Sequence, residues 1–336
     1  MTIKIGINGF GRIGRLVFRN SLNNPNIKVV GINDLFDSDY ISYLLKYDST
    51  HGKLNNKISF NNNILTVDEN KIRISNFKDP SLINWGNLDV DFVVESTGLF
   101  LTNELASKHI NAGAKNVIIS APVKDNTPMF VYGVNHNSYD PKMKVISNAS
   151  CTTNCLAPIS KVINDNFKIK NGLMTTVHAV TSSQNVLDIK SSKNWRLGRG
   201  AYQNIIPSST GAAKALGKVI PELDGKLTGM SFRVPIPNVS VVDLSLNTEI
   251  DTSYTEICQS IKYASENNFN NIIRYSEDSL VSSDILSDPH TSVFDSKSGL
   301  EISKNFFKII AWYDNEYAYS SKILDMINHA MKVINN

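Results

Sequence analysis

The sequence KIGINGFGRIGRLVFRN, residues 4–20, places the pattern Gly-x-Gly-x-x-Gly between a short apolar run and a helical segment. Residues 4–7 are typical of a buried strand, and a helix is expected over residues 13–20. Gly9, Gly11 and Gly14 permit a tight turn and a close approach of the backbone to a pyrophosphate. The helix N-terminus adds free N–H groups and the positive end of its dipole. In this context the motif predicts a dinucleotide site.

A second buried strand is expected over residues 27–32, and Asp34 follows it, 20 residues after Gly14. A carboxylate at this spacing can hold both hydroxyls of the adenosine ribose and would repel a 2′-phosphate, so Asp34 favours NAD over NADP. The alternative is an aspartate that only shapes the turn after the strand.

The rest of the first half alternates strands with helices. Strands are expected at residues 92–95 and 116–120, with a helical stretch at 104–112 between them, while residues 53–75 read as hairpins. The pattern predicts an α/β fold that begins with a doubly wound, Rossmann-type NAD-binding domain over residues 1–150.

The pattern changes after residue 147. A helix is expected over residues 151–166 and strands over 173–180, 226–234 and 239–248, which indicates an α+β catalytic domain over 151–316 with a mixed or antiparallel sheet. The amphipathic helix expected within residues 317–336 should pack on the first domain. Residues 182–206 form a long irregular stretch, which is usually functional or at an interface.

Composition excludes several classes of protein. The chain has 336 residues and a net charge of +3, without the dense basic runs of a dedicated nucleic-acid binder. No apolar run is long enough to span a membrane. The three cysteines, Cys151, Cys155 and Cys258, suit a reducing, cytoplasmic location better than a disulfide scaffold. No spacing of cysteine and histidine indicates a metal site.

Cys151 is the candidate nucleophile. Small polar residues around it are typical of a helix N-cap, so Cys151 is expected in the first turn, where the helix dipole and a nearby imidazole would lower the thiol pKa. Cys155, one turn on, reads as a buried small residue. His178 ends an apolar run, where strand ends face the ligand crevice, although a histidine there can also be a core residue.

Six segments in chain order resemble those of glyceraldehyde-3-phosphate dehydrogenases, and the resemblance covers essentially the whole chain. The segments are INGFGRIGR (7–15), YDSTHG (47–52), SNASCTTNCLAP (147–158), NIIPSSTGAAK (204–214), GKVIPE (217–222) and LTGMSFRVP (227–235). The sequence departs from the family pattern at Tyr317 and Ala318, where Trp and Gly are usual, and at residues 188–190, where a proline is usual.

The resemblance implies roles for named residues. Cys151 is the nucleophile and His178 its base. The further cofactor contacts implied are Arg12, Ile13, Lys78, Ser120 and Asn315. The residues implied to bind the substrate phosphate and the attacking inorganic phosphate are Ser150, Thr152, Thr181, Arg196, Thr210, Gly211 and Arg233. From the residues alone, Arg233 could instead form a salt bridge and Thr210 could cap a helix.

The implied reaction is the NAD-dependent conversion of glyceraldehyde 3-phosphate and inorganic phosphate to 1,3-bisphosphoglycerate, in glycolysis and gluconeogenesis, through a thiohemiacetal and a thioester on Cys151. The resemblance also implies a homotetramer in which residues 182–206 lie across a subunit interface. One alternative is an erythrose-4-phosphate dehydrogenase, to which Tyr317 and Ala318 give some weight. The other is a non-catalytic protein that binds NAD or nucleic acid.

Overall fold

In the computed structural model of the protein, which describes residues 2–191 and 194–336, the glycine motif joins strand β1 (Ile3–Asn8) to helix α1 (Arg12–Ser21). Strand β2 (Ile27–Asn33) follows and pairs in parallel with β1. The strand–turn–helix–strand order that the motif predicts is therefore present at the start of the chain.

The described residues divide into two compact units. The first contains the chain up to Tyr132 together with His136–Ala149 and Ser320–Asn336, and the second contains Gly133–Asn135 and Ser150–Tyr319. Each unit is built on one large sheet.

The sheet of the first unit has the order β3-β4-β5-β2-β1-β6-β7-β8. Neighbouring strands from β5 to β8 are parallel, and the hairpins at the β3 edge are antiparallel. From β1 the chain adds β2 on one side and later β6 on the other, which creates a topological switch point of the kind that binds ligands in α/β sheets. The remaining strands are β3 (Ile58–Asn61), β4 (Ile64–Val67), β5 (Asn70–Ser75), β6 (Phe92–Glu95), β7 (Asn116–Ile119) and β8 (Val145–Ser147).

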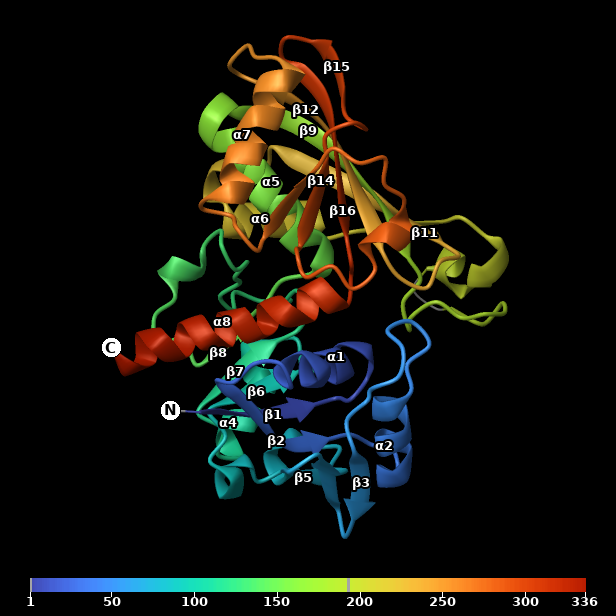
Figure 1. The fold of residues 1–336 in the computed structure, drawn as a ribbon, viewed down its shortest axis with the longest axis vertical. Coiled ribbons are helices and arrows are strands. Elements are labelled where there is room, and N and C mark those ends of the chain that lie inside the picture. The colour runs from blue at the N-terminus through green and yellow to red at the C-terminus, as the bar shows by residue number, and fades with distance from the viewer. Residues whose placement is uncertain (1, 192–193) are drawn as a thin grey trace. The chain divides into compact units, whose positions relative to one another are not determined.

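Helices flank this sheet (Figure 1). Besides α1 they are α2 (Ser38–Lys46), α3 (Asn103–Ala106), α4 (Lys108–Asn111) and most of α8 (Tyr317–Asn335). The helical stretch expected over 104–112 is present as two short helices: α3 and α4 meet at Ser107, which caps the end of one and the start of the other. Thr102 starts α3 by accepting a hydrogen bond from Leu105 N, and Gly113 follows α4 with a φ of +93°.

The core of the first unit contains the fully buried Trp85, which packs among aliphatic side chains from Ile83 to Val145. A side chain on Gly6 would meet the indole, because its Cβ would lie 2.7 Å from the ring. Strand β1 can therefore pass over Trp85 only with glycine at residue 6.

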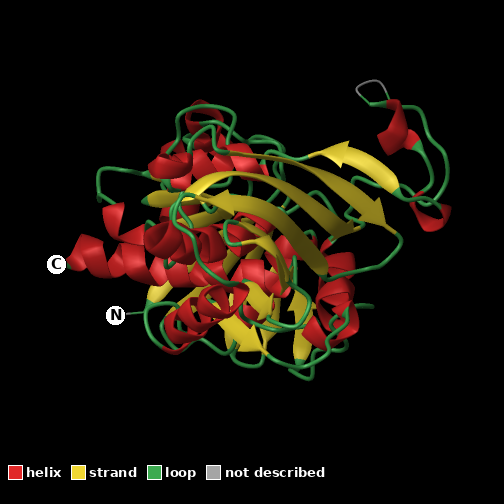
Figure 2. Cartoon of the chain, turned by 90° about the horizontal axis from the view of Figure 1, so that it is seen from above, coloured by secondary structure: helices red, strands yellow, loops and turns green. Residues whose placement is uncertain are grey.

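The sheet of the second unit has the order β10-β11-β9-β12-β16-β14-β13, with β15 paired to β16. It is mixed, because β9 pairs with β11 and β13 with β14 in parallel while the other pairs are antiparallel. Its long central strands curve side by side in Figure 2. The strands are β9 (Ile169–Ala179), β10 (Ile206–Ser209), β11 (Leu227–Val234), β12 (Ser240–Thr248), β13 (Ile273–Ser276), β14 (Ser292–Asp295), β15 (Leu300–Ser303) and β16 (Phe306–Tyr313).

Helices α5 (Cys151–Phe167), α6 (Ala212–Val219) and α7 (Tyr254–Glu266) belong to the second unit. The stretch 182–206 is irregular where it is described, with short 3-10 helices at Trp195–Gly198 and Ala201–Gln203, and residues 192–193 lie outside the described residues. Among the residues that are described, no helix has both the length and the apolar character needed to cross a membrane.

Candidate active site

Cys151 is the first residue of helix α5, as its sequence context predicts. The hydroxyl of Ser150 accepts a hydrogen bond from Thr153 N at 3.0 Å and so closes the N-terminus of the helix. The side chain of Cys151 is partly exposed, whereas Cys155, one turn on, is fully buried with its Sγ 3.8 Å from Ala311 O. The fold therefore leaves one thiol partly exposed at the start of α5 and packs the other away.

His178 faces this thiol from strand β9. Its Nε2 lies 3.6 Å from Cys151 Sγ, within hydrogen-bonding range for sulfur, and only 3% of its surface is exposed. Strand β11 pairs in parallel with β9 so that Arg233 lies directly beside His178. The sheet register thus brings together Cys151, His178 and Arg233, which lie up to 82 residues apart in the sequence.

The other ring nitrogen of His178 has two competing partners. Nδ1 lies 2.7 Å from the carbonyl oxygen of Ala179, which can only accept, and 2.5 Å from Nη1 of Arg233, which can only donate. If Nδ1 donates to Ala179, Nε2 carries a lone pair that can take the thiol proton. If Nδ1 accepts from Arg233, Nε2 carries a hydrogen that it can donate. The two partners therefore support both neutral tautomers of the ring.

Burial controls the protonation of this pair. It raises the pKa of the Cys151 thiol, while the charge of Arg233 and hydrogen bonds at Thr152 act in the other direction. Burial, together with the charge of Arg233, lowers the pKa of His178 to about 4, against the opposing effect of its hydrogen bond to Ala179. The lowered thiol pKa expected from the sequence is therefore not found, because desolvation of the thiol outweighs the helix N-terminus and His178 is neutral near pH 7. The resting pair is a thiol and a neutral base.

Tyr313, the last residue of β16, is a buried neighbour that sequence reasoning missed. Its hydroxyl bonds to Thr152 Oγ1 at 2.8 Å and to Thr176 Oγ1 at 3.0 Å, and its ring lies edge-on to that of His178, with centroids 6.0 Å apart. Burial holds its pKa well above the usual value, so Tyr313 stays a neutral phenol. It ties α5 to β9 behind the reactive pair.

The remaining phosphate candidates in the second unit make local contacts. Thr181 bonds to Ser183 and Gln184, and Thr210 Oγ1 accepts from the N–H of Ala212, the first residue of α6, whose N-cap residue is Gly211. Gly211 is exposed, and no atom lies within 4 Å of the position of a Cβ there. Arg196 is exposed in the 3-10 helix at Trp195–Gly198. No hydrogen bond within the described part of the chain links any of these four residues to Cys151.

The glycine motif forms a cradle at the carboxyl end of β1. Gly9 has a φ of +91°, and a Cβ there would lie 2.7 Å from Thr97 N, while a Cβ on Gly14 would lie 2.1 Å from Gly9 O. The position of a Cβ on Gly11, in contrast, faces open space. Gly11 caps α1, whose first turn holds no acidic residue. This geometry fits the pyrophosphate of a dinucleotide, because the backbone can approach an anion closely and no acidic side chain in the first turn of α1 repels it.

Asp34 lies beside this cradle. Its carboxylate accepts hydrogen bonds from Phe10 N at 2.5 Å and Phe36 N at 3.1 Å, which orients it at the end of β2. Arg12 binds the carboxylate of Asp48 in a bidentate manner, so its guanidinium is already engaged. Burial acts to raise the pKa of Asp48, but the bonds to Arg12, His51 and Thr50 outweigh it and lower that pKa to about 2.

Four cofactor candidates remain. Ile13 is half-buried in the first turn of α1, Lys78 is exposed after β5, and Ser120 is half-buried after β7. Asn315 belongs to the second unit, where its Oδ1 accepts from Ser240 Oγ at 2.9 Å. In the described part of the chain, no group of three or more histidine, cysteine, aspartate or glutamate residues could hold a metal ion.

Comparison with known proteins extends these observations. The chain matches two family profiles, described as the glyceraldehyde 3-phosphate dehydrogenase NAD binding domain, over residues 3–103, and the glyceraldehyde 3-phosphate dehydrogenase C-terminal domain, over residues 150–315. It is 58% identical over 327 residues to a glyceraldehyde-3-phosphate dehydrogenase of Buchnera aphidicola subsp. Schizaphis graminum, with 97% of this chain and 98% of the relative covered. It is 56% identical over 332 residues to glyceraldehyde-3-phosphate dehydrogenase A of Escherichia coli K12, with 99% and 100% covered.

Proposed function

Because the chain belongs to the glyceraldehyde-3-phosphate dehydrogenase family, we propose that it oxidises D-glyceraldehyde 3-phosphate with NAD and inorganic phosphate to give 1,3-bisphosphoglycerate. The chain is an NAD-dependent oxidoreductase that acts on an aldehyde, and the family reaction is a step of glycolysis. The observation that carries the proposal is the contact of 3.6 Å between Cys151 Sγ and His178 Nε2 at the start of α5.

The first step is the attack of Cys151 on the aldehyde. His178 takes the thiol proton at Nε2 while its Nδ1 hydrogen bonds to Ala179 O, and the thiolate adds to the carbonyl carbon. This addition forms a thiohemiacetal, in which the former carbonyl oxygen of the aldehyde is an alkoxide. The N–H of Cys151 and the protonated Nε2 can both donate to that oxygen, so the same residues that form the nucleophile stabilise its product.

The glycines of the α1 cradle would hold the pyrophosphate of NAD, and Asp34 would hold the adenosine ribose. When bound, NAD supplies the acceptor for the hydride that leaves the thiohemiacetal carbon. Loss of that hydride leaves a thioester on Cys151.

The second half of the reaction needs two phosphate sites, one for the phosphate of the substrate and one for the attacking inorganic phosphate. Arg233 lies beside His178 and offers a planar fork of donors, which suits a phosphate close to the thioester. We assign Ser150, Thr152, Thr181, Arg196, Thr210 and Gly211 to the two phosphate sites on the family resemblance. A phosphate oxygen attacks the thioester carbon, the C–S bond breaks, and the Cys151 thiolate returns with the acyl phosphate as product.

The test follows NADH absorbance with glyceraldehyde 3-phosphate and NAD, with and without inorganic phosphate, on the wild type and Cys151→Ser. Steady turnover that needs both phosphate and Cys151 supports the proposal, and a single burst without phosphate marks the stalled thioester. If the wild type forms no NADH, the proposal fails. Erythrose 4-phosphate in place of the substrate measures the competing activity.

We propose that the protein is a homotetramer in the cytoplasm. The free thiols of all three cysteines suit a reducing compartment, and the family resemblance supports the tetramer. Sedimentation at working concentration tests the assembly: a fully active monomer would exclude it.

A further inference from the structure

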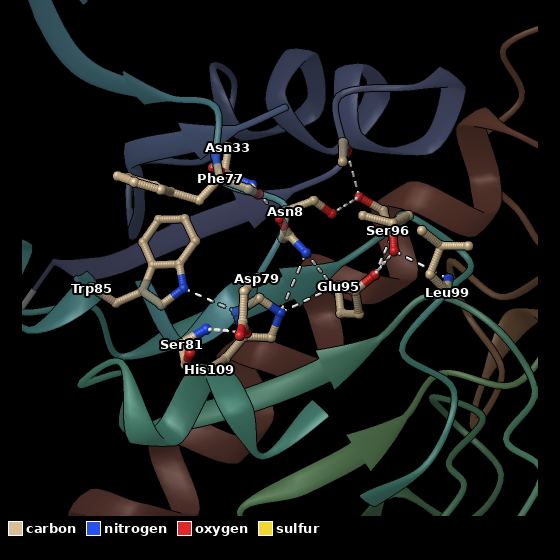
Figure 3. Close-up of polar contacts among 12 residues, drawn as sticks. Asn8, Asn33, Phe77, Asp79, Ser81, Trp85, Glu95, Ser96, Leu99 and His109 are labelled. Carbon is tan, nitrogen blue, oxygen red and sulfur yellow. Dashed lines mark hydrogen bonds and ion pairs between the residues drawn. The ribbon is translucent and has the colours of Figure 1, made fainter. Parts of the chain in front are cut away.

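The last residues of four adjacent strands form a polar row across the edge of the first sheet. Strand pairing places Ser75, Asn33, Asn8 and Glu95 side by side, at the ends of β5, β2, β1 and β6. Figure 3 shows Asn33, Asn8 and Glu95 of this row. Their side chains are hydrogen bonded in the same order: Ser75 Oγ to Asn33 Oδ1 at 3.0 Å, Asn33 Nδ2 to Asn8 Oδ1 at 2.8 Å, and Asn8 Nδ2 to Glu95 Oε2 at 2.6 Å. We call these four residues the strand-end row.

Buried aromatic residues support one end of the strand-end row. The indole N–H of Trp85 donates to His109 Nδ1 at 3.0 Å, and His109 Nε2 lies 3.0 Å from Glu95 Oε2. Because an indole can only donate, Nδ1 must accept, and the ring hydrogen must be on Nε2, where it points at Glu95. Trp85 thereby selects one neutral tautomer of His109. All three side chains are at most 1% exposed.

The carboxylate of Glu95 is surrounded by donors. Oε2 receives Asn8 Nδ2 and His109 Nε2, and Oε1 receives the N–H and the hydroxyl of Thr97 at 2.8 and 2.5 Å. Asn8 Nδ2, His109 Nε2 and Thr97 N can only donate, so three of the four partners favour the ionised form, and the Thr97 hydroxyl can donate to it as well. A buried charge held by four hydrogen bonds tolerates little displacement of any partner, because each lost bond exposes an unsatisfied group.

This network ends at the cofactor cradle. Glu95 fixes Thr97 N, and that atom is the one that a Cβ on Gly9 would meet. Ser96 Oγ donates to Gly9 O at 2.7 Å, and Asn8 immediately precedes Gly9. At the other side of the row, Asn33 immediately precedes Asp34. Both the glycine turn and the ribose-binding carboxylate therefore follow residues of one continuous hydrogen-bonded row.

We propose that four residues position the dinucleotide: Glu95, Asn8, His109 and Trp85. They hold the backbone of the glycine turn, residues 9–14, in the conformation that binds NAD. The inference depends on the proposed function only for the identity of the ligand. The four residues belong to the first unit, whereas Cys151, His178 and Arg233 belong to the second. Disturbing the network should therefore weaken NAD binding and leave turnover at saturating NAD nearly unchanged.

The test is a double-mutant cycle in the full-length enzyme, with the NAD dissociation constant measured by calorimetry. In Glu95→Gln one carboxylate oxygen becomes an NH2 group, which faces donors in either orientation of the amide (Asn8 and His109, or Thr97 N), and we expect NAD affinity to fall about tenfold. Adding Asn8→Asp returns an acceptor and the negative charge to the row, and we expect most of the affinity to recover. Glu104→Gln, at an exposed glutamate, is the matched control and should bind NAD like the wild type.

Each alternative gives a different result. If the network only stabilises the fold, Glu95→Gln lowers the melting temperature but leaves the dissociation constant and the KM for NAD unchanged, and the proposal fails. It also fails if Asn8→Asp does not restore binding to Glu95→Gln. A wild type that binds NAD but does not turn over would overturn the proposed reaction while leaving this comparison intact.

A second measurement does not depend on how well Glu95→Gln folds. Nitrogen NMR of the histidine rings should find the His109 hydrogen on Nε2 in the wild type. Trp85→Phe keeps the ring packing but removes the indole N–H, so hydrogen on Nδ1 should appear and NAD should bind about threefold more weakly. A wild-type ring with hydrogen on Nδ1, or a Trp85→Phe variant with unchanged NAD affinity, would contradict the assignment.

Discussion

Replacing His178 by asparagine removes the atom at Nε2, which lies 3.6 Å from Cys151 Sγ, and leaves an amide near the position of Nδ1 that can still bond to Ala179 O or Arg233. Burial raises the pKa of the Cys151 thiol above its usual value, so without a base the thiol form of Cys151 predominates near neutral pH. A positioned base contributes about 10²- to 10⁴-fold. We expect the rate of thioester formation to fall by that factor.

The pH dependence separates loss of the base from general damage. In the wild type the pKa of His178 is about 4, so the ring is neutral from pH 6 to 9 and the rate should change little over that interval. In His178→Asn the rate should follow the thiolate fraction and therefore rise with pH, because burial raises the pKa of the Cys151 thiol. The assay is the stopped-flow burst of NADH without phosphate, which isolates the first half-reaction. His290→Asn, at another histidine of the second unit, is the control.

A loss smaller than about tenfold in His178→Asn would refute the assignment of His178 as the base. So would a deficit that stays constant with pH, because it would show that ionisation of Cys151 is not the step that His178 assists.

Three further predictions concern stability and specificity. Since the pKa of His178 is lower in the folded protein than in the unfolded chain, stability should fall as the pH drops from about 6.5 to 4, by at most about 3 kcal/mol, and urea titrations should find a shallower fall in His178→Asn. Asp34→Ala should raise the ratio of NADP to NAD turnover about tenfold or more, because the repulsion of a 2′-phosphate is removed; an unchanged ratio of kcat/KM values would contradict the role. Tyr313→Phe leaves Thr152 and Thr176 without their shared partner and should cost about 1–3 kcal/mol of unfolding free energy in the same titrations, with Tyr263→Phe, at an exposed tyrosine, as the control.

The sequence predicts those parts of the fold that have a local cause. The glycine motif predicts β1, α1 and β2 because a tight turn and a helix start depend on adjacent residues. The start of α5 at Cys151 is confirmed, and it depends on a cap only one residue away. In contrast, α2 was not predicted, because Tyr40 and Tyr43 are about half exposed and obscure its amphipathic pattern.

The parts that could not be predicted depend on register and burial. Asn8, Asn33 and Glu95 each read as an ordinary polar residue after a strand, and only the pairing of β2, β1 and β6 shows that they form one row. The position of Arg233 beside His178 likewise follows from the register of β9 and β11, 55 residues apart in sequence. The direction of the Cys151 pKa shift depends on how much water reaches the thiol, which spacing cannot give.

The division of the chain between the two units has a consequence for biosynthesis. The first unit includes Ser320–Asn336, whereas the second is complete once Tyr319 has been made. The glycine-turn unit, although its strands are made first, therefore lacks its last helix until after the sequence of the second unit has been made. Because the buried Ile323, Met326 and Ile327 lie on that helix, apolar surface of the first unit stays uncovered until then. Chaperones that shield apolar surface should therefore bind the first half of the chain until that helix is in place.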